Sequence, residues 1–149
     1  METVTNVSPE VLHAIYHTSI FAGIGLLEQK MLAAKSTVTR CSAGDIVIEQ
    51  GDIGDTLYII MKGQMLVSVR DISTGWKRVN TLGPGDVVGE IAIIKRIPRT
   101  ARVSAITPCI YLTIKAEDFF AAYRSFPPKA RDNIQLVVAK RLQELGLLH

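Results

Sequence analysis

Two ionisable residues, Glu90 and Arg99, lie nine residues apart in the segment VGEIAIIKRIPRTARV and could recognise a polar molecule. An arginine side chain is a rigid fork of hydrogen-bond donors that suits phosphate oxygens, and a carboxylate can only accept hydrogen bonds. Gly89 and Ala92 leave the backbone bare enough for a charged group to approach. The pair could therefore hold a molecule with an anionic phosphate at one end and a sugar hydroxyl at the other. A structural ion pair between Glu90 and Arg99 is the alternative.

The composition is typical of one folded domain, and we assign residues 1–149 to it. Hydrophobic residues make up 48% of the chain and charged residues 21%, which excludes a disordered protein. The net charge of +3 is small and no basic run accompanies it, so nucleic-acid binding is not indicated. The amino terminus has no secretory apolar core, and no segment approaches the length of a membrane span. We expect a cytoplasmic chain, either whole or part of a larger protein.

Helical patterns occupy both ends of the chain. In residues 8–36, Ser8 can cap a first helix with Pro9 in its first turn, and LLEQKMLAAK forms a second helix. In residues 115–149, AEDFFAAYRSF forms a short helix, and KARDNIQLVVAKRLQELGLL forms a longer one after two prolines. One face of the last helix is apolar and needs a cover, which could be the barrel, a ligand, a second subunit or another domain. That face comprises Ile134, Val138, Leu142 and Leu145, with Val137 and Leu148 beside it.

Residues 37–114 have a different character, with short runs rich in Val, Ile and Tyr between glycine–aspartate turns. Many short strands at this spacing indicate an all-β barrel or sandwich. We expect a tight bend at Gly63. The strand candidates are IVIE, TLYIIMKG, QMLVSVR, KRVNTL, RVSAI and CIYLTI.

Several spaced segments resemble the cyclic nucleotide-binding domain family of kinase regulatory subunits, nucleotide-gated channels and catabolite-activator-type regulators. They are AGDIVIEQGDIGDTLYIIMKGQMLV, then LGPGDVVGEIAII, then PRTARV, and the resemblance covers nearly the whole chain. It implies a mainly β fold with flanking helices: an eight-stranded antiparallel β-roll, jelly-roll-like, with N-terminal helices. A short phosphate-binding helix inside the roll and C-terminal hinge and lid helices complete that fold.

The resemblance also implies roles for individual residues. Gly89, Glu90, Ile91 and Ala92 open a short helix whose backbone amides face the cyclic phosphate, where unpaired N–H groups favour an anion. Glu90 would accept a hydrogen bond from the ribose 2′-hydroxyl. Arg99 would pair with the exocyclic phosphate oxygens.

The remaining expected ligand contacts are Val67, Val88, Thr100, Ala101 and Arg141. Val67 would form an apolar wall against the base, a role compatible with core packing. The hydroxyl of Thr100 faces the base edge in the family and suits guanine without excluding adenine; a strand hydroxyl bonded to nearby backbone is the alternative. Arg141, or its neighbour Lys140, could stack on the base as a lid residue, and both could instead be solvated helix charges.

The chain departs from the family at several positions. Arg96 replaces a small residue, often glycine, and Arg102 replaces a small or hydroxyl residue. We expect both arginines at the surface, where they add positive charge near the pocket. An inward Arg96 would instead pair with Glu90 and weaken ribose binding. The pair Val87-Val88 stands where aromatic residues are common, which would loosen the wall beside the sugar.

Other chemistry has little support in the sequence. His13 and His17 have the i, i+4 spacing of metal ligands, but nothing completes a site, so we interpret them as an ordinary helix pair. Cys41 and Cys109 lie in apolar, strand-like sequence, which favours a structural pair of buried thiols over a disulfide or metal site. A nucleophile–base pair is lacking, so we expect no enzyme and no cofactor.

Together these features predict a sensor domain that binds cAMP or cGMP and moves its C-terminal helices on binding, with a hinge around residues 119–128. Its possible partners are an effector domain or protein, or a second copy, engaged through the last helix. DNA binding by this chain alone is not expected. The alternative is a ligand-free β-roll that serves as a protein-interaction or dimerisation module.

Overall fold

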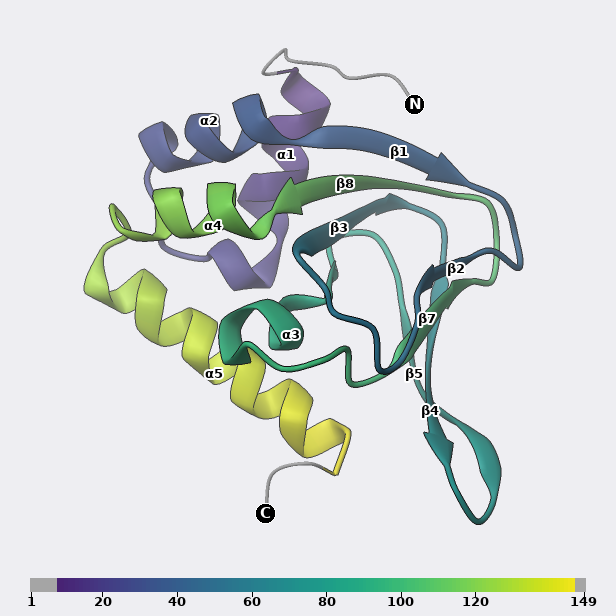
Figure 1. Cartoon of the computed structure of the whole chain (residues 1–149). Helices are drawn as coiled ribbons and strands as arrows, with labels where there is room; N and C mark the ends of the chain where they lie inside the picture. The colour runs from purple at the N-terminus through teal and green to yellow at the C-terminus, as the bar shows by residue number, and fades with distance from the viewer. Residues whose placement is uncertain (1–7, 147–149) are drawn as a thin grey trace.

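The computed structural model describes residues 8–146, which form a β-roll with helices on one side (Figure 1). Ser8 caps the first helix as expected, since its Oγ accepts a hydrogen bond from the Val11 amide at 3.2 Å. In chain order the elements are α1 (Pro9–His17), η1 (Ser19–Phe21), α2 (Leu26–Lys35), β1 (Thr37–Cys41), β2 (Ile46–Ile48), β3 (Thr56–Lys62), β4 (Met65–Asp71), β5 (Gly75–Leu82), β6 (Val87–Val88), α3 (Glu90–Lys95), β7 (Arg102–Ala105), β8 (Cys109–Lys115), α4 (Ala116–Tyr123) and α5 (Pro128–Glu144).

The strands form two four-stranded antiparallel sheets, with the orders β1-β8-β3-β6 and β2-β7-β4-β5. This confirms the predicted eight-stranded roll with flanking helices and a short internal helix. Strands β1 and β6 have no counterpart among the six segments selected from the sequence. Gly63 turns the chain from β3 to β4 with a φ of +94°, and a Cβ there would lie 2.5 Å from the Pro108 carbonyl oxygen.

Two apolar clusters support the roll. One lies between the two sheets and includes Ile60, Met65 and Val103. The other joins the sheet of β1, β8, β3 and β6 to the helices, and its aromatic residues Phe21 and Phe119 have ring centroids 6.1 Å apart. The helices therefore pack directly against one sheet of the roll through a shared apolar cluster.

Helix α5 runs from the helical side of the molecule, below α4, and passes α3 (Figure 1). Ile134 and Val138 are fully buried, and α5 packs against η1 and α3. The Asn133 side-chain amide donates a hydrogen bond to the Ser19 carbonyl at 2.7 Å. The rest of the chain thus covers much of the apolar face predicted for this helix. Leu148, which was assigned beside that face, lies outside the described residues.

Cys41 and Cys109 are register partners across β1 and β8, and both are free thiols. Cys109 is buried and Cys41 is half-buried, so the prediction of a thiol pair holds with one partner less covered than expected. Burial raises the pKa of Cys41 above its ordinary value, which keeps that thiol protonated. Within residues 8–146, no helix is long and apolar enough to cross a bilayer.

Candidate ligand-binding site

A cavity opens between the β-roll and the last turns of α5, and all ten residues predicted to contact a ligand line it. The roll supplies Val67 from β4 and Ala101 just before β7, and α5 supplies Arg141. The other predicted residues on its wall are Val88, Gly89, Glu90, Ile91, Ala92, Arg99 and Thr100. Tertiary structure therefore brings together segments from three separate parts of the chain.

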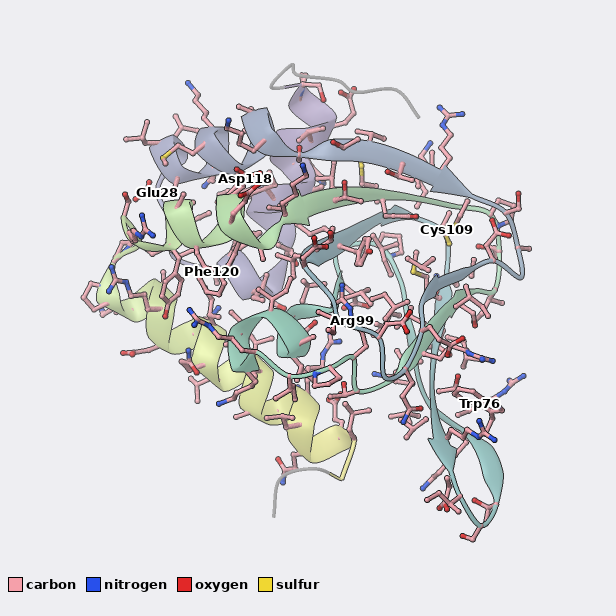
Figure 2. The ribbon with its side chains drawn as sticks, in the orientation of Figure 1. Glu28, Trp76, Arg99, Cys109, Asp118 and Phe120 are labelled. Carbon is pink, nitrogen blue, oxygen red and sulfur yellow. The ribbon has the colours of Figure 1, made fainter. Side chains whose placement is uncertain are left out.

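Arg99 lies inside the roll near α3 and is 7% exposed (Figure 2). Its Nη1 donates a hydrogen bond to the Gly89 carbonyl at 2.9 Å, and its Nη2 donates to the Thr56 carbonyl at 2.8 Å. Burial lowers the pKa of Arg99, while Tyr58 and other acidic groups nearby oppose that change. The guanidinium stays charged, because an arginine pKa lies far above neutral pH. The structure thus holds a fixed cation in the cavity wall.

Two glycines make room for that guanidinium. A Cβ on Gly54 would collide with the Arg99 Nε, and a Cβ on Gly89 would collide with its Nη1. Gly89 also has a φ of +85°, a left-handed conformation that side chains other than glycine rarely adopt. Gly89 precedes α3, so the same residue starts the helix and admits the cation.

Glu90 is the first residue of α3 and is 2% exposed. Within residues 8–146, its Oε1 atom has no hydrogen-bond partner. Burial raises the pKa of this carboxyl group, and the positive charges of Arg141 and Arg99 oppose the rise. A buried acceptor left without a donor is costly, so it marks a position where a ligand hydroxyl would be favoured.

Glu90 and Arg99 do not form the ion pair considered from the sequence, because Arg99 bonds to backbone carbonyls. Glu90 instead faces Arg141 on α5, with 3.6 Å between its Oε1 and the Arg141 Nη1. The alternative interpretation of Arg141 as a solvated helix charge is therefore wrong, whereas Lys140 beside it is exposed.

Several wall residues were not selected from the sequence: Ile48, Val79, Asn80, Leu82, Val103, Glu144 and Leu145. Of the apolar ones, Ile48, Val79, Leu82 and Val103 lie on the strands β2, β5 and β7, and Leu145 lies at the C-terminal end of α5. Asn80 and Glu144 are the polar additions, and no local signal marks them. Asn80 reaches the cavity through the pairing of β5 with β4, and Glu144 reaches it through the packing of α5 against the roll.

The two departures Arg96 and Arg102 both lie outside the cavity. Arg96 ends α3 with a left-handed φ of 55°, is exposed, and places its guanidinium carbon 5.9 Å from the centroid of the Phe120 ring. It does not reach Glu90. Arg102 forms a bidentate ion pair with Glu49, at 2.9 Å for each hydrogen bond. Arg102 is half-buried, and Glu49 balances the positive charge that Arg102 was expected to add near the pocket.

A scan of protein families matches residues 38–126 to the cyclic nucleotide-binding domain. The chain belongs to this family. One relative among curated proteins is the cAMP-dependent protein kinase regulatory subunit of Yarrowia lipolytica, 32% identical over 118 residues. That match covers 76% of this chain and 30% of the relative, so the chain spans about a third of that protein.

Two solved structures are similar to this chain over more residues than the matched segment 38–126. The Thermus thermophilus catabolite activator protein has a TM-score of 0.75 and 25% identity, over 87% of this chain and 61% of that one. The regulatory subunit of a cAMP-independent protein kinase A from Trypanosoma brucei has a TM-score of 0.76 and 24% identity, over 89% of this chain and 46% of that one. The cyclic nucleotide-binding fold therefore includes the flanking helices.

Proposed function

We propose that this domain binds a cyclic nucleoside monophosphate, cAMP or cGMP, and acts as a non-enzymatic sensor in a regulatory pathway. Arg99 neutralises the cyclic phosphate, and Glu90 accepts a hydrogen bond from the ribose 2′-hydroxyl. The apolar wall around Val67 and Val88 packs against the rest of the ligand. The family assignment of the chain supports this ligand class.

The observation that carries the proposal is that, in the described residues, the Glu90 Oε1 atom accepts no hydrogen bond and lies in the same cavity as the Arg99 guanidinium. A cation and an unsatisfied acceptor together match a ligand that has an anion and a neighbouring hydroxyl. A charge-assisted bond from Arg99 to phosphate is worth about 1.5–3 kcal/mol. The two groups therefore contribute both affinity and selection for a ribose.

The position of α5 supports coupling between occupancy and movement. The cavity volume at the site is about 60 Å³, well below the roughly 300–1,000 Å³ of typical ligand pockets. A nucleotide is much larger, so its access requires the residues of α5 at the site, including Arg141 and Leu145, to move away from the roll. Helix α5 starts at Pro128, two residues after a buried aromatic residue, Phe126. This connection is the hinge we expect to bend.

A ligand-free interaction or dimerisation module is the second candidate, and the Glu90–Arg141 pair favours it. This pair closes the site with the chain's own charges. Leu136 on α5 is 69% exposed, so a protein partner or a second copy could cover that surface. The similarity to a regulatory subunit described as belonging to a cAMP-independent kinase is consistent with this candidate.

Isothermal titration of the purified chain with cAMP and cGMP separates the two functions. Binding of either nucleotide supports the sensor. The absence of a binding signal with both nucleotides supports the interaction module. Arg99→Leu should weaken binding by about 100-fold or more, because it removes the phosphate counter-charge. Arg78→Leu, at an exposed position of β5, is the matched control and should bind as the wild type does.

Glu90 is tested with a 2′-deoxy cyclic nucleotide. The wild type should bind the ribose form more tightly than the deoxy form, and Glu90→Gln should lose most of that preference. Circular dichroism and thermal melting establish that each variant is folded. Unchanged affinity in a folded Arg99→Leu variant would falsify the phosphate role.

A further inference from the structure

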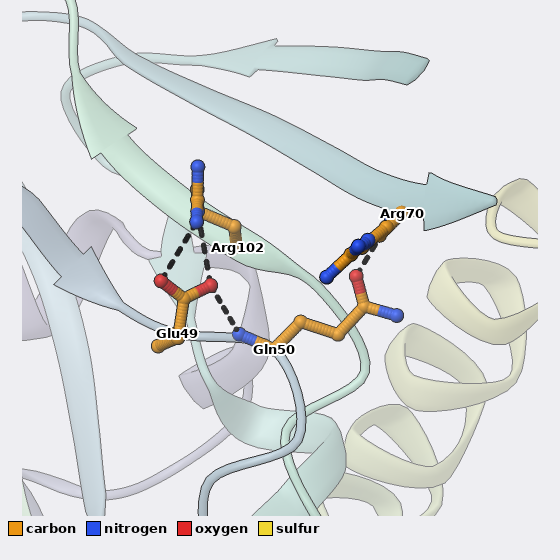
Figure 3. A network of polar contacts seen from close by, with 4 residues as sticks. All are labelled: Glu49, Gln50, Arg70 and Arg102. Atoms are coloured by element: carbon orange, nitrogen blue, oxygen red, sulfur yellow. Dashed lines mark hydrogen bonds and ion pairs between the residues drawn. The ribbon is translucent and has the colours of Figure 1, made fainter. Parts of the chain in front are cut away.

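A polar network outside the cavity links the two residues after β2, Glu49 and Gln50, to β4 and β7 (Figure 3). Arg102 donates from Nε and Nη2 to the two carboxylate oxygens of Glu49, both at 2.9 Å. The Glu49 Oε1 also accepts a hydrogen bond from the Gln50 amide at 3.1 Å, and the Gln50 side-chain oxygen accepts from the Arg70 amide at 2.7 Å. Arg102 further lies over the Trp76 ring, 3.8 Å from its centroid. The Glu49 carboxylate and the Trp76 ring together fix the orientation of the planar Arg102 guanidinium.

The segment that this network orders is attached to the backbone of Arg99. The Gly51 amide donates to the Arg99 carbonyl at 2.8 Å, and the Arg99 amide donates to the Asp52 carbonyl at 2.7 Å. Glu49 and Gln50 lead directly into this turn, and Arg102 follows three residues after Arg99. The Glu49–Arg102 pair and the two backbone hydrogen bonds thus join the same two segments, residues 49–52 and residues 99–102.

We propose that Glu49 and Arg102 are positioning residues that hold the backbone of Arg99, so that its guanidinium stays directed at the phosphate. Trp76 supports them by fixing the plane of Arg102. Neither Glu49 nor Arg102 lines the cavity, so they act only through Arg99. This inference rests on the proposed function, since it assigns the network to the same phosphate site.

The signs of the effects distinguish positioning from simple electrostatics. The ligand is an anion, so removal of a nearby positive charge weakens binding through space and removal of a negative charge strengthens it. Arg102→Gln and Glu49→Gln should then have opposite effects. If the pair positions Arg99, both substitutions weaken binding, because each one breaks the same bidentate contact.

The experiment is a titration of cAMP and cGMP into the wild type, Glu49→Gln, Arg102→Gln and the double variant. We expect each single variant to bind about 3–10-fold more weakly, and the double variant to bind no more weakly than the singles. Lys77→Gln and Glu117→Gln remove one exposed charge of each sign outside the network and should bind as the wild type does. Tighter binding by Glu49→Gln, or additive losses in the double variant, would overturn the proposal.

Amide hydrogen exchange tests the network without any ligand. The amides of Gly51 and Arg99 should exchange faster in both single variants, while amides of α1 keep their wild-type rates. Unchanged exchange at Gly51 and Arg99 would overturn the positioning role even if binding changes. A wild type that binds neither nucleotide contradicts the proposed function, and exchange alone then decides whether the pair orders the Arg99 backbone.

Discussion

The Arg141 guanidinium on α5 lies 3.6 Å from the buried Glu90 carboxylate, and this ion pair ties the last helix to the first residue of α3. Glu90 has one oxygen without a hydrogen bond, so Arg141 compensates its charge without satisfying it. The 3.6 Å contact is not a hydrogen bond, so the Oε1 atom can still accept one from a ligand hydroxyl. The pair therefore joins α5 to the wall of the cavity.

Arg141→Met should destabilise the fold by about 1–2 kcal/mol at neutral pH, because it leaves a buried carboxylate without its counter-charge. Methionine keeps an apolar stem, so lost packing contributes little. Urea unfolding measures the change. The matched control is Lys140→Met, at the exposed neighbouring position, and an equal loss in both variants would contradict the role of the pair.

The pH dependence of stability should report the raised pKa of Glu90. A folded-state pKa above the ordinary 4.5 means that the native state binds more protons than the unfolded chain in the interval between the two values. The free energy of unfolding therefore falls as pH rises through that interval. Glu90→Gln lacks this loss. The free energy of unfolding of the variant should therefore increase relative to that of the wild type as pH rises. Urea midpoints over a pH series measure the difference, and a difference that is constant with pH would refute this account.

Gly54→Ala should weaken cyclic nucleotide binding by about 10–100-fold, since small displacements of a binding group are costly. The added methyl group would collide with Arg99 Nε and push the guanidinium from its place. Gly54 has no left-handed φ, so the backbone itself accepts alanine. In the control Gly83→Ala, the methyl group meets only the flexible Gln64 side chain at 3.0 Å. Comparable affinity in the two variants would show that Arg99 adapts.

Arg96→Gly should stabilise the fold by about 0.5–1 kcal/mol, because it relieves a left-handed conformation at the end of α3. The lost contact with Phe120 offsets part of this gain. Lys95→Gly, one residue earlier and within the helix, should instead destabilise the fold by a similar amount. Thermal melts of the two variants give the signs, and a loss in Arg96→Gly would contradict the strain argument.

Local chemistry determined a large part of this protein. The Ser8 cap, the helix LLEQKMLAAK and most strands follow from patterns a few residues long, and the structure confirms them. These features could be read from the sequence because neighbouring residues decide them. Glu90 and Arg99 line one cavity, in agreement with what the family resemblance implied.

Only the tertiary structure decided which groups meet inside and around the site. Arg99 bonds to the carbonyl of Thr56, 43 residues away, rather than to Glu90. Glu90 meets Arg141 rather than Arg96, and Arg102 finds Glu49 across 53 residues. Each arginine had several acceptors available. Which acceptor it contacts depends on which strands pair and on where α5 packs. These contacts join segments that are far apart in the sequence, so no local pattern records them.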